Sequence, residues 1–294
     1  MHSNSHIRAF ANLIKLSRAV KDIQPQVVIS LGCSYRLMHA AGIFDSAKTV
    51  LSERNWPPSY YRDNGKRVNE YYKRANCVVF QTPDARDCFP LIKSACVIPN
   101  PVPRSEVRWH GFQSHEIIYF GRLDKQKRPE IALKAFQIFL QTHRDYHLSI
   151  YGIGSERESL LAYIVDQGLS ESVSINPPSK HIHNIASNAL LYLNTSDYEG
   201  ISNSMLEALS MGIPCVCTDC DGGGARLAIQ DGVNGLLASK GDAESIASAM
   251  SRIADSTVFA SAISKEARNR IRAFDSDVVF SKWSELIDSV AASE

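Results

Sequence analysis

The sequence lacks the long apolar segments of a membrane protein. No run of about 18 or more apolar residues occurs in its 294 residues, so no transmembrane helix is predicted. The polar N-terminus carries no apolar signal region, and we therefore expect a cytoplasmic protein. The seven cysteines are odd in number and scattered, which argues against a disulfide framework.

Several motifs that would define other kinds of protein are incomplete. Gly152-Ile153-Gly154 lacks the third glycine of a dinucleotide-binding fingerprint, which disfavours an oxidoreductase. Cys215, Cys217 and Cys220 have no second Cys/His pair to complete a zinc set, and we expect Cys215 and Cys217 to be small buried residues of a strand. Asp219-Cys220-Asp221 has the spacing of a metal motif but no third carboxylate. We expect no metal site and no cofactor.

What is present is the composition of a globular α/β protein, with 44% apolar and 21% charged residues. Short β-branched runs alternate with helically spaced segments in both halves, which predicts open parallel sheets with helices on both faces. The proline-rich segment 99–103 predicts a linker. We therefore predict a first domain at residues 1–103 and a second at 104–294, with a final helix at 280–291 packing back on the first.

The charge is unevenly distributed along the chain. The first 110 residues hold 16 Lys and Arg against 8 Asp and Glu, and the remainder holds 16 against 23. No nucleic-acid motif occurs, so the basic half favours contact with an anionic membrane surface or a lipid-phosphate acceptor. Tyrosines interleave with basic residues between Tyr60 and Arg74, which suggests an acceptor face. The alternatives are a chance asymmetry of a solvated surface and one ordinary amphipathic helix.

The stretch Glu199–Glu207 carries the most specific chemistry. It follows an apolar strand-like run and precedes an apolar helical run, so we expect Glu199 on a loop and Glu207 in the first turn of a helix. Between them, the backbone N–H groups at Gly200–Ser204 lie at a helix N-terminus, which favours anions. Two acids beside such a site suggest a ligand with phosphates and hydroxyls, such as a nucleotide sugar. The alternative is a capping Ser or Asn with two solvated acids.

A second group of candidates follows the strand predicted at residues 115–120. Gly121 permits a tight turn, and Arg122 and Lys127 would project two cations toward the same crevice. Two cations neutralise a diphosphate and stabilise the departing nucleoside diphosphate in a transfer reaction. The alternative is a surface basic cluster, since Lys125 and Arg128 adjoin.

The order of these motifs resembles a known family. Gly-Arg-Leu-x-x-x-Lys at 121–127, Tyr-Gly-x-Gly at 151–154, the two-glutamate stretch, Gly-Ile-Pro-Cys-Val-x-Thr at 212–218 and Asp-Gly-Val-Asn-Gly-Leu-Leu at 231–237 are similar to the family 4 (group 1) retaining glycosyltransferases of the GT-B architecture. The resemblance covers roughly residues 95–285. Gly222–Arg226 and Ser52–Asn55 resemble bacterial enzymes of polysaccharide and lipid-linked oligosaccharide synthesis.

The resemblance implies an enzyme with two Rossmann-like parallel-sheet domains that moves a hexose, with retention, from a nucleoside-diphosphate sugar to a glycan or lipid-linked acceptor. Arg122 and Lys127 would bind the donor diphosphate, the N–H groups of Ile201, Ser202 and Asn203 the distal phosphate, and Glu207 the ribose. Glu199 would lie beside the anomeric carbon. Uridine is favoured as the base by the resemblance alone, and no metal is implied.

The first domain departs from the family pattern. The family's opening strand and glycine-rich loop have no counterpart, Gly32–Arg36 stands where many members carry a histidine, and the strand predicted at 26–31 would expose its edge. We therefore expect an incomplete first domain and hold open a truncated, catalytically impaired protein that only binds the nucleotide sugar. A sugar-nucleotide epimerase is a further alternative.

Overall fold

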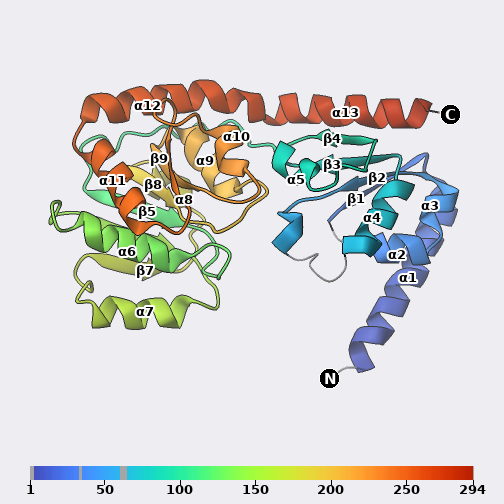
Figure 1. Ribbon diagram of the computed structural model, residues 1–294, viewed down its shortest axis with the longest axis horizontal. Helices are drawn as coiled ribbons and strands as arrows, with labels where there is room; N and C mark the ends of the chain where they lie inside the picture. The colour runs from blue at the N-terminus through green and yellow to red at the C-terminus, as the bar shows by residue number, and fades with distance from the viewer. Residues whose placement is uncertain (1–2, 33–34, 60–64, 294) are drawn as a thin grey trace. The chain divides into compact units, whose positions relative to one another are not determined.

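The computed structural model describes residues 3–32, 35–59 and 65–293, and it divides into two compact units. One unit comprises Met1–Pro99 with Phe280–Glu294, and the other Asn100–Val279. Each contains one parallel sheet, as Figure 1 shows, so the predicted fold class is confirmed. No helix among the described residues has both the length and the apolar character needed to cross a bilayer.

The first unit is built on four parallel strands in the order β1-β2-β3-β4. These are β1 (Val27–Leu31), β2 (Lys48–Ser52), β3 (Cys77–Phe80) and β4 (Ala95–Val97). The helical segments are α1 (Ser3–Ile23), α2 (Tyr35–Ala40), α3 (Ile43–Ser46), η1 (Pro57–Ser59), α4 (Gly65–Arg74) and α5 (Pro83–Asp87). The strand predicted at 26–31 forms β1, which lies at the edge of the sheet as expected, and its Leu31 is 70% exposed.

Tyr72 shows that part of the predicted acceptor face is core. Its ring is fully buried against Tyr35, Phe80 and Phe89, and its hydroxyl donates to the buried Glu53 carboxylate at 2.8 Å. The sequence pattern of alternating tyrosines and basic residues could not show that Tyr72 points into the core. The other predicted members at residues 60–64 lie outside the described residues.

The second unit contains six parallel strands in the order β10-β9-β8-β5-β6-β7. They are β5 (Glu116–Phe120), β6 (His147–Tyr151), β7 (Val173–Asn176), β8 (Leu191–Asn194), β9 (Cys215–Asp219) and β10 (Leu236–Ser239). The helical segments are α6 (Pro129–Phe139), α7 (Arg157–Asp166), α8 (Ile182–Ala186), α9 (Asn203–Met211), α10 (Gly224–Ala228), α11 (Ala243–Ala254), α12 (Thr257–Arg270) and η2 (Ile271–Phe274), and α13 (Ser276–Ala292) continues from this unit into the first.

Alternating strand residues divide the core of the second unit into two layers. Ile117 and Val216 pack with α6, α7 and α11, whereas Ile118, Cys215 and Cys217 pack with α9 and α10. Cys215 and Cys217 are 0% and 1% exposed, which confirms that they are buried strand residues. Strand order reverses between β5 and β8, and such a switch point opens a crevice at the carboxyl ends of the strands.

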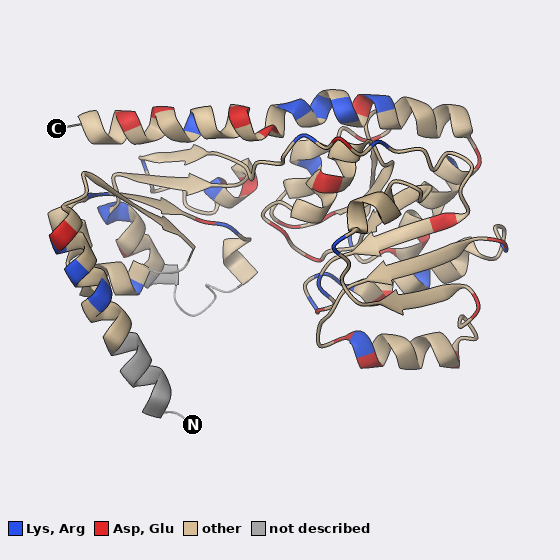
Figure 2. Cartoon of the chain, turned by 180° about the vertical axis from the view of Figure 1, so that it is seen from behind, with Lys and Arg blue, Asp and Glu red and all other residues tan. Residues whose placement is uncertain are grey.

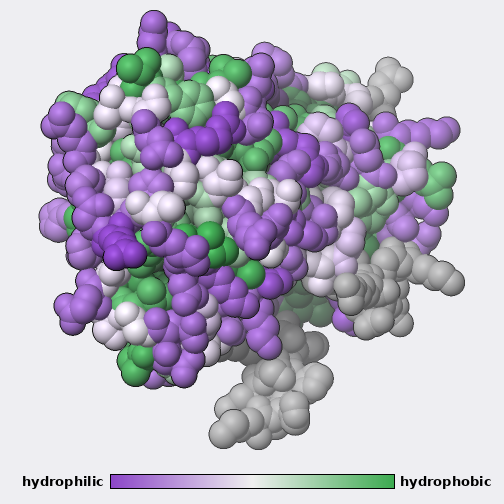
Figure 3. All heavy atoms as spheres, turned by 60° about the vertical axis from the view of Figure 1, so that its left-hand side comes forward, coloured by the Kyte–Doolittle hydropathy of each residue, from purple (hydrophilic) through white to green (hydrophobic). Residues whose placement is uncertain are grey.

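Charged residues are concentrated on helices and loops, as Figure 2 shows, and blue segments gather where α12 approaches α13. On the face in Figure 3, hydrophobic residues form small separate patches among hydrophilic ones. That face therefore shows no large apolar surface of the kind that marks an interaction site.

Candidate functional site

Three loops at the carboxyl edge of the second sheet are tied together by backbone hydrogen bonds. The loop after β5 accepts a bond from the loop after β8, with Asp197 N donating to Gln126 O at 2.8 Å. The loop after β9 accepts another, with Glu199 N donating to Asp221 O at 2.9 Å. Residues predicted from separate motifs are thus brought to one place.

Lys127 and Glu199 form an ion pair at the centre of this arrangement, between Nζ and Oε1. Both side chains are 12% exposed. Ser196 Oγ donates to the same carboxylate oxygen at 3.0 Å, and Thr195 Oγ1 donates to Lys127 O at 3.0 Å. A buried ion pair persists when additional hydrogen bonds, such as the one from Ser196 to the carboxylate, satisfy its charged groups. The sequence placed both residues at the site but did not predict their contact.

The start of α9 lies beside the Lys127 ammonium. Ser202 occupies the N-cap position, but its hydroxyl does not cap the helix. It instead accepts from Asn194 Nδ2 at 3.0 Å and lies 3.5 Å from Lys127 Nζ. Because the hydroxyl is turned away from the helix N–H groups, they are left to bind an anion, reinforced by the helix dipole and the lysine charge.

The remaining residues of the predicted phosphate loop differ in their exposure. Ile201 and Ser202 are both buried, at 4% exposed. Asn203 is exposed, and its side-chain oxygen accepts from Asn100 Nδ2 at 2.7 Å. Ser204 Oγ lies 2.8 Å from the Tyr192 hydroxyl. Asn203 is therefore the most exposed residue of this loop.

Glu207 lies in the second turn of α9, because the helix begins at Asn203 and has no acidic residue in its first turn. The expected first-turn position was wrong, because Glu207 is the fifth residue of the helix and lies just beyond its first turn. Its carboxylate is 3.1 Å from His183 Nε2, and both side chains are partly exposed. His183 belongs to α8, whose five residues are too few to show a helical period in the sequence.

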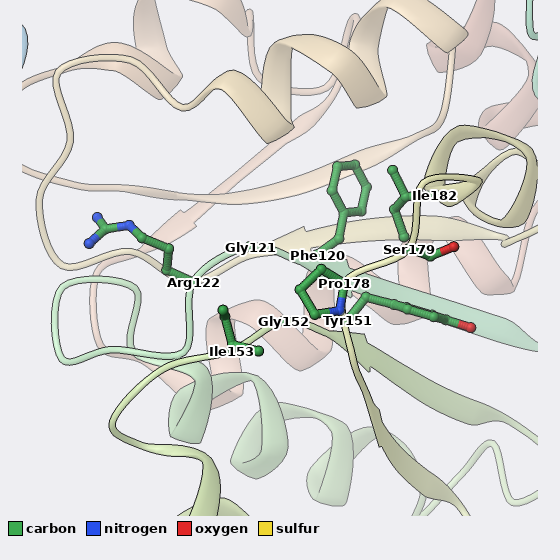
Figure 4. Close-up of a pocket in the computed structure, with 9 residues that line it drawn as sticks. All are labelled: Phe120, Gly121, Arg122, Tyr151, Gly152, Ile153, Pro178, Ser179 and Ile182. Carbon is green, nitrogen blue, oxygen red and sulfur yellow. The ribbon is translucent and has the colours of Figure 1, made fainter.

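An apolar pocket of about 290 Å³ opens at the ends of β5, β6 and β7. Figure 4 shows its lining residues, which are Phe120, Gly121, Arg122, Tyr151, Gly152, Ile153, Pro178, Ser179 and Ile182. Ile182 precedes His183 directly, so the pocket adjoins the His183–Glu207 pair. A flat apolar group and a neighbouring hydroxyl-bearing group would fit this combination.

Arg122 is less firmly placed than Lys127. Its side chain is 62% exposed and pairs with Asp124 at 2.5 Å, while Nη2 donates to Gln126 Oε1 at 3.1 Å. In Figure 4 it extends away from the other pocket residues. Gln126 in turn donates to Tyr198 O at 3.0 Å. The structure therefore connects Arg122 to the Glu199 loop through Gln126.

Glycines next to the site permit close contact between loops. A Cβ on Gly152 would lie 2.0 Å from Gly121 O, and one on Gly154 would lie 2.0 Å from Leu123 O. A Cβ on Gly224 would lie 2.0 Å from Gly200 O. The packing of these glycines shows that they let the site loops approach one another.

Both carboxylates of the Asp219-x-Asp221 motif are paired with cations. Arg226 Nε donates to Asp219 at 2.7 Å, and Lys240 Nζ donates to Asp221 at 2.9 Å. The hydrogen bond that Lys240 donates to Asp221, together with the charges of Asp221 and Asp197, raises the pKa of Lys240. The two aspartates therefore organise the loops after β9 and β10.

The burial of Cys220 can be tested by measuring the stability of the fold at high pH. Burial, aided by the Glu199 carboxylate, raises the pKa of Cys220 from an ordinary 9.0 to about 12. The unfolded chain therefore ionises first, and stability is lost as pH rises through this window. At pH 10 the loss from this thiol is about 1.4 kcal/mol. Thermal unfolding should show Cys220→Ala losing less stability than wild type between pH 7 and 10; equal losses would contradict the assignment.

The protein-family match lies within the second unit. Residues 114–256 match the model of the glycosyl transferases group 1 family. An exopolysaccharide phosphotransferase of Streptomyces coelicolor is 27% identical over 286 residues, which are 95% of this chain and 30% of that protein. A lipopolysaccharide 1,6-galactosyltransferase of Salmonella typhimurium is 32% identical over 142 residues, which are 46% of this chain and 38% of that protein.

Solved structures show the same fold. The structure of HepE from Anabaena in complex with UDP and glucose superimposes with a TM-score of 0.84 at 17% identity, covering 94% of this chain and 81% of that one. The chain spans only about a third of the two sequence relatives, so their whole-protein activities are not assigned to it by the match.

Proposed function

We propose that this chain, whose residues 114–256 are a group 1 glycosyltransferase domain, transfers a hexose from a nucleoside-diphosphate sugar in the synthesis of a bacterial surface polysaccharide. The observation that carries the proposal is the buried Lys127 ammonium beside the uncapped start of α9. Together they form a site for a diphosphate at the switch point of a parallel sheet.

The nucleoside fits the outer part of the same edge. Glu207, which is partly exposed, accepts hydrogen bonds and would bind the ribose hydroxyls. The base would enter the apolar pocket between Phe120 and Ile182. Uridine is our choice of base, supported by the UDP in the HepE complex. In this arrangement the diphosphate extends from the pocket toward the start of α9.

Lys127 and Arg122 would stabilise the negative charge that develops on the departing nucleoside diphosphate. Glu199 holds Lys127 in place and would lie beside the anomeric carbon of the donor sugar. We propose that the reaction retains the anomeric configuration and needs no cofactor or metal. The pairing of Asp219 with Arg226 and of Asp221 with Lys240 supports this, because both carboxylates already have cationic partners.

The acceptor is proposed to be a glycan or a lipid-linked oligosaccharide at the inner face of the cytoplasmic membrane. The basic first 110 residues support this location, because anionic lipids attract Lys and Arg. The Salmonella relative is a lipopolysaccharide galactosyltransferase, which supports such an acceptor. No nucleic-acid partner is proposed.

Thermal unfolding with UDP, GDP and ADP tests the donor site. A nucleotide at 100 times its Kd should stabilise the protein by about 2.7 kcal/mol. Glu207→Ala should lose this stabilisation, whereas its own stability should barely change, because an exposed pair contributes little. Glu285→Ala, an exposed glutamate of α13, is the matched control. If no nucleotide stabilises the folded protein, or if Glu207→Ala responds like the control, the assignment fails.

A further inference from the structure

Besides the apolar pocket, the second unit contains a polar cavity that lies away from the start of α9. Its volume is about 320 Å³, and we call it the arginine cavity. Its lining residues are Arg104, Ser105, Arg108, Ser210, Arg268, Ile271, Arg272 and Asp275. Ser210 is seven residues beyond Asn203 on α9, which places the cavity roughly 10 Å along the helix from the proposed diphosphate site.

The four guanidinium groups of the cavity face only one carboxylate among its lining residues. Asp275, which is 4% exposed, pairs with Arg104 at 2.6 Å. In the described part of the chain, the side chains of Arg268 and Arg272 have no ion pair and no hydrogen-bond partner. They are four residues apart on the continuous turn from α12 into η2, so their like charges repel. The blue segments at this end of α12 in Figure 2 lie in the same region.

Packing holds two of these arginines toward the cavity. A Cβ on Gly212 would lie only 2.8 Å from the Arg268 side chain, so the stem of Arg268 packs closely on this glycine. Arg108 Nη1 donates to the backbone carbonyls of Ser105 and Val107. Neither arginine therefore needs a large rearrangement to face a ligand, which lowers the entropic cost of binding one.

The chemistry of the lining identifies the ligand class. Both cavity serines already donate to backbone carbonyls, Ser105 to Val107 O at 3.2 Å and Ser210 to Glu207 O at 2.8 Å. The remaining donors are guanidinium groups, whose fork matches phosphate oxygens. Four cations and one carboxylate leave an excess that one carboxylate ligand would not balance. A phosphate group carries roughly −1.5 to −2 charge at neutral pH, so a diphosphate or two adjacent phosphates would balance it.

We propose that the arginine cavity is a second anion site that binds a phosphate-bearing ligand with two adjacent phosphate groups. Binding relieves the repulsion between Arg268 and Arg272 and supplies both with partners. The ligand is either a soluble diphosphate compound or the phosphorylated headgroup of a lipid, and the two share the chemistry that the cavity recognises. The site is independent of the donor site, since no residue is common to both.

Titration calorimetry of the full chain with inorganic pyrophosphate tests this proposal. Arg268→Gln with Arg272→Gln should weaken binding roughly ten- to a hundredfold, because hydrogen bonds from charged donors are lost. Arg270→Gln with Lys265→Gln removes two exposed cations of α12 outside the cavity and is the matched control. The control should bind like wild type, and binding should weaken as salt rises.

The same variants distinguish pyrophosphate binding at the donor site from binding at the arginine cavity. Binding at the donor site would survive in Arg268→Gln with Arg272→Gln, and equal affinities in this variant and the control would overturn the proposal. Vesicles of diacylglycerol pyrophosphate in phosphatidylcholine, whose headgroup carries two adjacent phosphates, are compared with vesicles of phosphatidylcholine alone to separate the two ligand sources. Sedimentation that depends on Arg268 and Arg272 identifies a lipid headgroup, and pyrophosphate binding alone identifies a soluble ligand. If neither probe binds in a way that depends on these arginines, the site does not exist.

Discussion

Lys127→Met should lower the rate of sugar transfer roughly a hundred- to a thousandfold, the range seen when one group that stabilises transition-state charge is removed. It should also destabilise the fold by about 3 kcal/mol, because Glu199 keeps a buried charge without its partner. Urea unfolding and a nucleotide-release assay measure the two effects separately. Lys134→Met, an exposed lysine of α6, should change neither quantity by much.

A double variant distinguishes the lysine's chemical role from its structural one. Lys127→Met with Glu199→Gln removes both charges, so most of the lost stability should return. Transfer should stay impaired, since the cation beside the diphosphate is still missing. Recovery of transfer together with stability would show that Lys127 acts only through the fold. A stable single variant would show that the pair is not buried from water as the structure describes.

Gly224→Ala should disturb the site although residue 224 contributes no functional side chain. The added methyl would lie 2.0 Å from the backbone oxygen of Gly200, which directly precedes Ile201 and Ser202. Backbone cannot rotate aside as a side chain does, so the phosphate loop must move. We expect a stability loss of about 1–3 kcal/mol and a fall in kcat/KM on the order of a hundredfold, as a displacement near 1 Å produces.

Gly168→Ala provides the comparison for Gly224→Ala. Gly168 has a φ of +66° and open space around its Cβ position, and it connects α7 to the amino end of β7. Its replacement should cost stability through backbone strain of about 1–2 kcal/mol while leaving nucleotide affinity unchanged. If both variants lose stability but neither loses affinity, the Gly200–Gly224 contact does not position the phosphate loop.

The sequence was sufficient for the elements whose patterns are local. Parallel strands such as β5 and β9 are short β-branched or apolar runs between helical segments, and their positions were predicted to within about two residues. Cys215 and Cys217 were correctly interpreted as buried because they alternate on such a strand. The small helices α8 and α10 were missed, since five residues contain too little of a helical period.

The contacts within the site depend on tertiary packing, so they could not be predicted from the sequence. Lys127 and Glu199 are 72 residues apart, and only the arrangement of the β5 and β8 loops brings them together. His183 pairs with Glu207 for the same reason. Tyr72 lies inward because α4 turns that side toward the core, which its basic neighbours concealed. The arginine cavity joins residues 104–108 with residues 268–275, and nothing in either local sequence indicates the other.

The most direct measurement is the anomeric configuration of sugar released from nucleotide donors. Each of UDP-glucose, UDP-galactose and UDP-N-acetylglucosamine is incubated with the full chain without acceptor, and proton NMR follows the first sugar formed by slow donor hydrolysis. For one donor we expect the α-anomer to appear first, with UDP, and to be absent with Lys127→Met. Release of the β-anomer would contradict retention. Absence of release from every donor, by a folded protein that binds UDP, would contradict sugar transfer from these donors.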